Sequence, residues 1–129
     1  MPARVQIESV ATEVVSACIR VHRELGAGLL ESVYQACLSE ELCDRGLRVE
    51  CEVPMPVSYR GRVLDVGFRV DMLVDDLIII ENKCLKSILP IHEAQLLTYL
   101  RLSKRKLGFL INWNVLLIKD GIQRMVLNL

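Results

Sequence analysis

Long apolar runs, a basic charge excess and closely spaced cysteine pairs are all missing from this sequence. No stretch reaches the roughly 18 apolar residues that a membrane-spanning helix needs. The opening residues, MPARVQIESVATEV, lack the basic and apolar regions of a signal peptide. We therefore expect a cytoplasmic protein that makes no membrane contact.

The five cysteines are an odd number, and no two of them have the CxxC spacing of a zinc site. Only His22 and His92 are available as additional zinc ligands. Thiols are among the most buried side chains, so we expect small buried hydrophobic residues in a reducing compartment. They are Cys18, Cys37, Cys43, Cys51 and Cys84.

The charge is balanced, with 16 basic and 16 acidic residues. Dedicated nucleic-acid binders usually carry a basic excess, because phosphate contacts dominate their affinity. The balance argues mildly against tight unaided DNA binding. It does not exclude a nuclease, whose metal ions supply positive charge locally.

The length of 129 residues and the hydrophobic content of 52% predict a single domain spanning 1–129. Apolar periodicity and glycine positions predict helices and strands in the order ααβββαββ(β). This order indicates an α/β or α+β fold, in which helices flank a mixed sheet. The helices are expected at 5–25, 30–45 and 90–106, and the strands at 47–59, 63–74, 77–84, 107–112 and 114–119, with a last short strand after Gly121.

The most informative segment is the end of the expected strand 77–84. A run of isoleucines, 78–80, is typical of a central strand covered on both faces, yet it is followed at once by Glu81 and Lys83. Burying such charges costs several kcal/mol each, at order of magnitude, unless they are paired or bind a metal. Because Glu81 and Lys83 are two residues apart, their side chains point to the same face.

Asp71 is expected on that face too, because its neighbours Val70 and Met72 are apolar and should point into the core. The connection at Asp75-Asp76 decides this. A two-residue turn would place Asp71 and Glu81 on opposite faces, whereas a three-residue loop or a β-bulge brings them together. We predict the three-residue loop or the bulge.

Two adjacent carboxylates repel each other, and a divalent cation removes that repulsion. Oxygen ligands suit Mg²⁺ or Mn²⁺, and a nearby ammonium can hold the attacking water and offset phosphate charge. The alternative is structural: Glu81 pairs with Lys83, or Asp71 pairs with Arg69, at the exposed end of a hairpin. The pattern D-x9-E-x-K taken alone leaves both readings open.

Two further motifs carry a family resemblance. Gln95 and Tyr99, within QLLTY, resemble the QxxxY motif of RecB-type and lambda-exonuclease-like proteins of the PD-(D/E)xK nuclease superfamily. Residues 28–34, GLLESVY, match the GxxExxY pattern of a protein family assigned to the same superfamily. The order of motif-bearing helices and strands is also similar, although Val70 stands where the family pattern has proline.

The resemblance implies a restriction-endonuclease-like core and metal-dependent hydrolysis of phosphodiester bonds, in DNA more than in RNA. It implies that Asp71, Glu81 and the backbone carbonyl of Asn82 hold Mg²⁺ or Mn²⁺, and that Lys83 serves the water. Further roles are implied for four residues: Glu31 as an outer metal ligand or water-orienting group, Gln95 and Tyr99 on the phosphate or against Lys83, and Tyr34 as a packing anchor.

Each of these roles has a structural alternative. Glu31 is also placed where a helix dipole favours a carboxylate, and Tyr99 where a core aromatic would lie. His92 shares a helix face with Gln95, but we expect a structural role for it. A basic run closes the third helix, either as a solvated face or as a phosphate-binding patch. It comprises Arg101, Lys104, Arg105 and Lys106.

Two other functional classes remain open. One is a non-catalytic nucleic-acid-binding or accessory module on the same fold. The other is a homo-oligomer, in which the apolar strands Phe109–Asn112 and Val115–Ile118 pair across a sheet edge.

Overall fold

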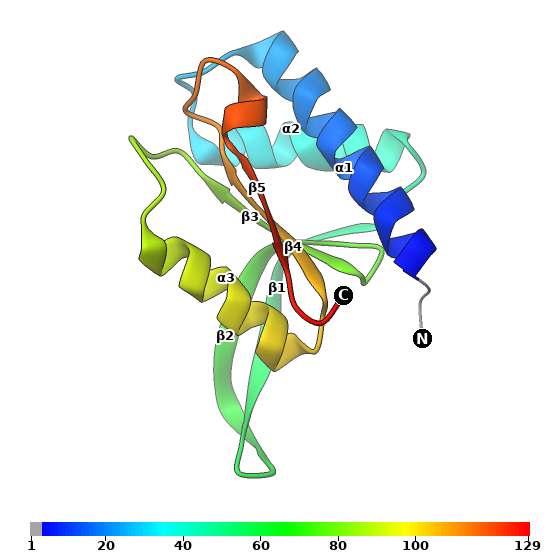
Figure 1. Cartoon of the computed structure of the whole chain (residues 1–129), viewed down its shortest axis with the longest axis vertical. Helices are drawn as coiled ribbons and strands as arrows, with labels where there is room; N and C mark the ends of the chain where they lie inside the picture. The colour runs from blue at the N-terminus through cyan, green and yellow to red at the C-terminus, as the bar shows by residue number, and fades with distance from the viewer. Residues whose placement is uncertain (1–3) are drawn as a thin grey trace.

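The computed structural model describes residues 4–129, which form a mixed α+β fold with helices on both faces of one sheet (Figure 1). None of the helices within these residues is long and apolar enough to cross a membrane. The first three residues of the expected domain lie outside the described residues. The helices are α1 (Arg4–Leu25), α2 (Glu31–Asp44), α3 (Pro90–Ser103) and the short 3-10 helix η1 (Ile118–Asp120).

Within residues 4–129, five strands lie in sequence order across the sheet, β1-β2-β3-β4-β5. Only β3 and β4 are parallel, because α3 connects them, while every other neighbouring pair is antiparallel. The predicted mixed sheet is therefore confirmed. The strands are β1 (Val49–Tyr59), β2 (Arg62–Val74), β3 (Ile78–Lys83), β4 (Leu107–Asn112) and β5 (Ile122–Val126).

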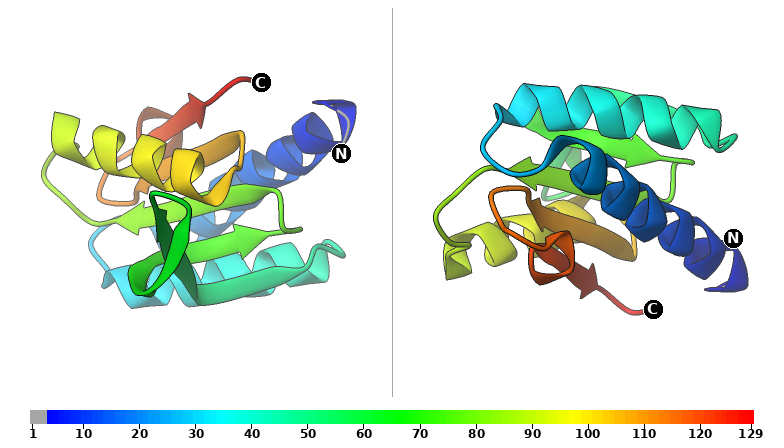
Figure 2. Two further views of the ribbon diagram at one scale, coloured as in Figure 1. Left: turned by 90° about the horizontal axis from the view of Figure 1, so that it is seen from below. Right: turned by 90° about the horizontal axis from the view of Figure 1, so that it is seen from above.

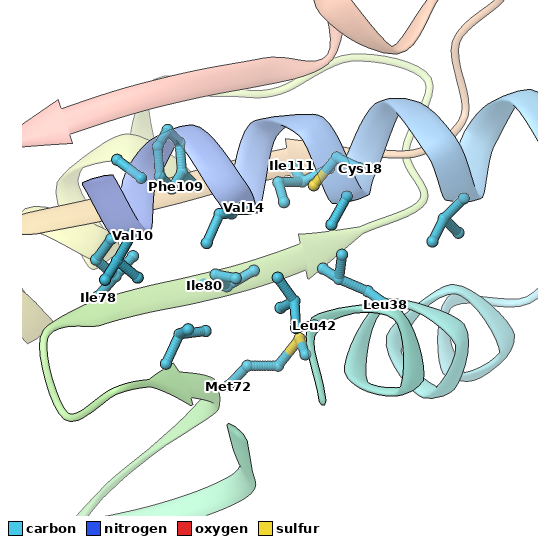
Figure 3. Packing of buried hydrophobic residues seen from close by; sticks show 14 of the residues in the cluster. Val10, Val14, Cys18, Leu38, Leu42, Met72, Ile78, Ile80, Phe109 and Ile111 are labelled. Atoms are coloured by element: carbon cyan, nitrogen blue, oxygen red, sulfur yellow. The ribbon is translucent and has the colours of Figure 1, made fainter. Parts of the chain in front are cut away.

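The helices divide between the two faces of the sheet, with α1 and α2 on one face and α3 on the other (Figure 2). The larger hydrophobic cluster lies under α1 and α2, where Val14, Leu38 and Ile80 meet (Figure 3). The smaller cluster lies under α3 and includes Ile79 and Leu96. Because both faces are covered, Ile78–Ile80 is fully buried, as the isoleucine run predicted.

Gly108 allows α3 to pack close to the sheet. A Cβ at this position would lie 3.0 Å from the Leu96 side chain and 3.1 Å from the Ile79 carbonyl oxygen. The sequence predicted that this helix ends at residue 106, but α3 ends at Ser103. Lys104 adopts the left-handed conformation at φ 59° and turns the chain directly toward β4.

The predicted strand 114–119 is wrong. The backbone N–H of Asn112 donates to the Gly121 carbonyl at 2.8 Å, so the chain doubles back immediately after β4. Residues 114–117 are bends that lead into η1, and Leu116 is 94% exposed. The proposed edge pairing of Phe109–Asn112 is wrong as well, because β4 lies inside the sheet between β3 and β5.

Candidate active site at the fork of two strands

The site lies where β2 and β3 separate, which we call the strand fork. The two strands pair from Val74↔Ile78 to Met72↔Ile80, and beyond that point β2 continues beside β1 and β3 beside β4. The pairing closes a three-residue loop, 75–77, so the next positions along the ladder are Asp71 and Glu81. The predicted loop length is confirmed, and both acidic side chains lie at the fork.

At the fork, where β2 and β3 stop pairing through their backbones, the two carboxylates accept hydrogen bonds from backbone N–H groups of the opposite strand. The Asp71 backbone N–H donates to Glu81 Oε2 at 2.8 Å. The Asn82 backbone N–H donates to Asp71 Oδ2, also at 2.8 Å. Each carboxylate is thus fixed by the backbone of the opposite strand. Its other oxygen makes no hydrogen bond within residues 4–129, so Asp71 Oδ1 and Glu81 Oε1 are available to a ligand.

The fork is electrostatically costly without a cation. Burial and then the charge of Asp71 raise the pKa of Glu81 to about 8, although the Asp71 backbone N–H and Lys83 oppose the shift. The pKa of Asp71 is also raised, chiefly by burial and then by the charge of Glu52, although the Asn82 N–H counteracts it. Ionising both carboxylates in this site is therefore unfavourable unless a positive charge lies close to them.

Lys83 supplies part of that positive charge and is not engaged in an ion pair within residues 4–129. Its ammonium lowers the pKa of Glu31, Asp71 and Glu81, yet among residues 4–129 it forms no salt bridge. The structural alternative named both Glu81–Lys83 and Asp71–Arg69 pairs, and neither forms. Arg69 instead pairs with Glu52, at 3.1 Å.

Asn82, between the two charged residues of β3, is held by a hydrogen-bond network that runs from the buried core to the surface. Its Oδ1 accepts from Trp113 Nε1 at 2.9 Å, and its Nδ2 donates to Gln35 Oε1 at 3.2 Å. The other end of the Gln35 amide donates to Glu52 Oε1 at 2.9 Å. The network therefore fixes the segment whose backbone holds Asp71. The sequence named Asn82 only for its carbonyl and gave no signal for Gln35 or Trp113.

Glu52 is a second residue that the sequence did not reveal. It lies in β1 opposite Asp71, between the pairs Cys51↔Met72 and Val53↔Val70. Its φ of 53° is in the left-handed region, which is unfavourable for a side chain other than glycine or asparagine. Its charge acts on Asp71, Glu81 and Glu31, so it belongs to the electrostatic surroundings of the fork.

Glu31 borders the fork from the first residue of α2. It is exposed, and its pKa is raised by partial burial and then by the charge of Asp71. It lines an open surface pocket of about 450 Å³ together with Gln35 and Glu52. Both readings of Glu31 therefore hold structurally: it occupies the helix N-terminus and lies near the fork. Its role as an outer ligand stays a prediction.

Tyr99 and Gln95 both belong to α3, and the charges of Glu81 and Asp71 act on Tyr99, which places it near the fork. The Tyr99 ring stacks on Phe68 with centroids 4.6 Å apart. Burial raises the pKa of the Tyr99 hydroxyl, as do the charges of Glu81 and Asp71, and the hydroxyl makes no hydrogen bond within residues 4–129. Gln95 is exposed one turn earlier and is also without a side-chain hydrogen bond in that range. Their predicted functional roles are not tested by this geometry.

Two other side chains singled out in the sequence, Tyr34 and His92, are structural. The Tyr34 hydroxyl donates to the Gly26 carbonyl at 2.6 Å and accepts from the Leu29 N–H at 3.2 Å. The ring is fully buried against Trp113, which confirms its anchoring role. His92 Nδ1 accepts from the Leu89 N–H at 2.9 Å, so it caps the start of α3.

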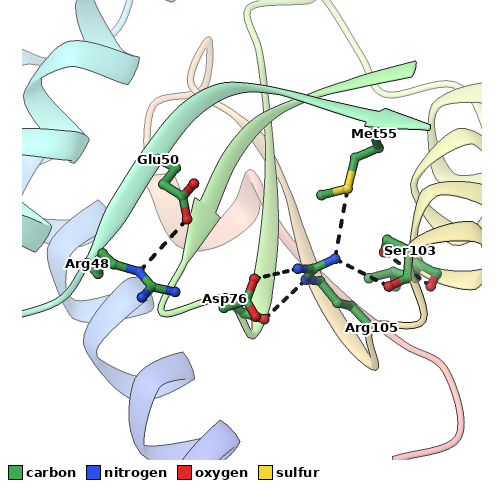
Figure 4. A network of polar contacts seen from close by, with 7 residues as sticks. Arg48, Glu50, Met55, Asp76, Ser103 and Arg105 are labelled. Atoms are coloured by element: carbon green, nitrogen blue, oxygen red, sulfur yellow. Dashed lines mark hydrogen bonds and ion pairs between the residues drawn. The ribbon is translucent and has the colours of Figure 1, made fainter. Parts of the chain in front are cut away.

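The basic run at the end of α3 lies away from the fork. Arg105 donates to Asp76 Oδ1 at 2.5 Å and to the carbonyls of Asp76 and Ser103 (Figure 4). Asp76 belongs to the loop that precedes β3, whereas Lys83 ends that strand. Arg105 is thus a structural residue, and the run occupies the opposite end of β3 from the carboxylates.

The donor set fits a hard divalent cation. Asp71 and Glu81 each present a free oxygen, and Mg²⁺ commonly takes one or two carboxylates with water and substrate phosphate. Within residues 4–129 there is no cluster of three or more His, Cys, Asp or Glu side chains arranged for a metal. A metal here would be held by two side chains and the Asn82 carbonyl, with Glu31 farther out.

Comparisons with known proteins agree with this geometry. A model of the PD-(D/E)XK nuclease superfamily matches residues 8–125. A search of curated proteins gave no match. Among solved structures, the crystal structure of SSO0001 is similar with a TM-score of 0.50 and 23% sequence identity. The match covers 97% of this chain and 61% of that one, so this chain spans about three fifths of its length. This likeness concerns the fold.

Proposed function

Because this chain belongs to the PD-(D/E)XK nuclease superfamily, we propose that it is a nuclease that hydrolyses phosphodiester bonds, in DNA in preference to RNA. The observation that carries the proposal is the pair Asp71 and Glu81, each tied to the opposite strand and each with one free oxygen. The sheet and helices are consistent with a restriction-endonuclease-like core.

The metal is Mg²⁺ or Mn²⁺, held by Asp71, Glu81 and the Asn82 carbonyl. When bound, such an ion neutralises the carboxylates and polarises the phosphodiester and its attacking water. The chain fixes the two ligands before the ion arrives, since backbone N–H groups already hold them. This preorganisation avoids the cost of arranging two repelling charges during binding.

Lys83 positions the attacking water, and its ammonium charge makes it easier for that water to lose a proton to solvent. It is half-buried beside three carboxylates and forms no ion pair within residues 4–129, so its ammonium is free to meet a ligand. Glu31 orients water at the outer edge of the site. These roles follow from placement and charge together.

Gln95 and Tyr99 act as the QxxxY pair and contact the phosphate of the bound strand. The Tyr99 hydroxyl and the Gln95 amide have no protein partner within residues 4–129, which suits groups reserved for a substrate. Residues 28–34 act as the GxxExxY segment, with Tyr34 fixing the chain that delivers Glu31.

The test is cleavage of plasmid, linear and single-stranded DNA and of RNA by purified protein in Mg²⁺ or Mn²⁺. We expect Asp71→Asn to abolish cleavage, because it removes a ligand charge at nearly constant shape. Asp120→Asn is the matched control, since Asp120 is exposed in η1 and should leave cleavage unchanged. Equal activity of wild type and Asp71→Asn would refute the assignment, and absence of Mn²⁺ binding would favour the non-catalytic module.

A further inference from the structure

The hairpin of β1 and β2 extends beyond the helices as a two-stranded arm, residues 56–66 (Figure 1). Every residue of the arm is exposed except Val57, which is half-buried. The tip is a two-residue turn in which Arg60 and Gly61 have φ of 53° and 78°, the twist that closes a tight hairpin. The arm is thus a paired two-stranded ribbon, with one register shift between Pro56 and Ser58, rather than an unpaired loop.

The surface of the arm is both apolar and basic. Val63 is 71% exposed and Val66 67% exposed, so the arm presents apolar surface to solvent. An isolated two-stranded hairpin is marginally stable in water, so such a surface gains from a partner. The partner has to accept apolar contact along the ribbon and positive charge at its tip.

The charges at the tip favour an anionic partner. Arg60 lies over the Tyr59 ring at 5.8 Å, and within residues 4–129 neither Arg60 nor Arg62 forms a salt bridge. Asp65 is the only acidic residue of the arm. The neighbouring surface by α2 is acidic instead, with Glu31, Glu40 and Glu52 around one pocket. A polyanion is therefore directed along the arm and away from α2.

The shape of the arm selects among nucleic acids. The major groove of B-form DNA admits a two-stranded β-ribbon, whereas the major groove of A-form RNA is too deep and narrow for side chains to read. Exposed valines can contact thymine methyl groups, and arginines can contact phosphates or guanine edges. These properties match duplex DNA.

The arm is continuous with the strand fork. Strand β2 runs without interruption from Arg62 at the tip to Asp71 at the fork. At about 3.3 Å per residue, these nine steps span at most about 30 Å, which is about 9 base pairs of duplex. A duplex held by the arm therefore reaches the carboxylates within roughly one helical turn.

We propose that the arm, residues 56–66, enters a groove of duplex DNA and holds the duplex against the fork. The proposal rests on the nuclease function above for its substrate, but it concerns binding rather than hydrolysis. Arg60 and Arg62 neutralise phosphates at the tip, and Val63 and Val66 line the groove.

The experiment measures DNA binding in EDTA, where cleavage cannot interfere. A labelled 30-base-pair duplex is titrated at several salt concentrations with wild type, with the double variant Arg60→Gln/Arg62→Gln and with the control Lys104→Gln/Lys106→Gln. The two double variants are matched, because each removes two cations, and Arg60 and Lys104 both have positive φ. All three proteins should show the same thermal midpoint.

We expect Arg60→Gln/Arg62→Gln to weaken duplex binding and to reduce the magnitude of the log K against log salt slope by about 2, with the control unchanged. Wild type should bind the DNA duplex better than a double-stranded RNA of the same sequence. An unchanged slope in the arm variant, or an equal loss in the control, would overturn the proposal.

The two proposals fail separately. Asp71→Asn should bind duplex DNA as wild type does, so arm-dependent binding without any cleavage would refute the nuclease and leave the arm. Cleavage that is unaffected by Arg60→Gln/Arg62→Gln would refute the arm proposal and leave the nuclease.

The arm could instead bind a second copy of the chain. A dimer in sedimentation that Val63→Ser converts to a monomer, with DNA binding independent of Arg60 and Arg62, would show this.

Discussion

The indole N–H of Trp113 donates to the side-chain oxygen of Asn82 at 2.9 Å, across 31 residues of sequence. Trp113 follows β4 directly and is fully buried, and Asn82 stands between the acid and the lysine of β3. The contact therefore connects the core under α1 with the segment whose backbone N–H holds Asp71. It explains why a residue between two charges is itself buried.

Replacing Trp113 by phenylalanine should damage the site beyond its effect on stability. The change leaves the buried Asn82 oxygen without its donor, which costs about 1–3 kcal/mol of unfolding free energy. We expect Mn²⁺ affinity and cleavage rate to fall as well, because Asn82 is no longer fixed. Val14→Ala is the control, a cavity in the same core but away from the fork. If both variants lose stability and activity in the same proportion, the network has no positioning role.

The elevated pKa of Glu81 should make the metal-free protein less stable as pH rises. Glu81 holds its proton up to about pH 8 in the folded state, against an ordinary value of 4.5 in the unfolded chain. Its contribution is complete below about pH 4.5 and is lost as pH rises through about 8, since the folded state then has to bury the charge. Urea unfolding in EDTA from pH 5 to 8 should show this decline.

Glu81→Gln should flatten the decline, because glutamine does not titrate. The comparison isolates Glu81 from other titrating groups, which both proteins share. Mn²⁺ should act in the opposite sense, raising the thermal midpoint of wild type more at pH 8 than at pH 6, since ligands must lose their protons. Parallel pH curves for the two proteins would contradict the assigned pKa.

The two tyrosines of the motifs should separate stability from function. Tyr34→Phe removes a hydroxyl with two backbone partners and should cost about 1–3 kcal/mol in unfolding free energy. Tyr99→Phe removes a hydroxyl that has no protein partner within residues 4–129, so stability should change by less than about 0.5 kcal/mol. Cleavage should nevertheless fall for Tyr99→Phe. Full activity of that variant would show that the ring alone is needed.

Lys83→Met should lose activity while it keeps the metal. The change removes the ammonium beside the attacking water, for which we expect a fall of about 10²-fold or more in kcat. Mn²⁺ binding should persist or tighten, because a cation next to the carboxylates is removed. Lys119→Met, at an exposed lysine of η1, is the matched control. Loss of Mn²⁺ binding in Lys83→Met would show that this residue supports the fold of the site instead.

The sequence predicted the register of β2 and β3 because hydrophobic alternation determines which side chains are buried. Only an odd loop keeps Met72 and Ile80 in one core while Asp71 and Glu81 meet, and the structure has that loop. The prediction for Val70 was wrong. It packs in the cluster under α3 rather than beside Met72, because the alternation of β2 is interrupted opposite Glu52. The positive φ of Glu52 cannot be predicted from any local sequence pattern.

The expected strand at 114–119 failed for a related reason. Val115–Ile118 has the apolar composition of a strand, but the Asn112 side chain accepts from the Leu85 and Asn114 N–H groups and ends the ladder. A close approach of Gly121 to the Asn112 carbonyl then reverses the chain. Such contacts join distant residues, so neither they nor the Gln35–Asn82–Trp113 network is visible in periodicity.

The length of the 75–77 loop limits which insertions and deletions this protein can tolerate. Removing one codon there would shift the whole of β3 by one position and send its acid and its lysine to the face occupied by α1 and α2. Losses or gains of single residues at this connection should therefore abolish folding and chemistry together, whereas changes at the tip of the β1–β2 hairpin should leave the fold intact and act on DNA binding.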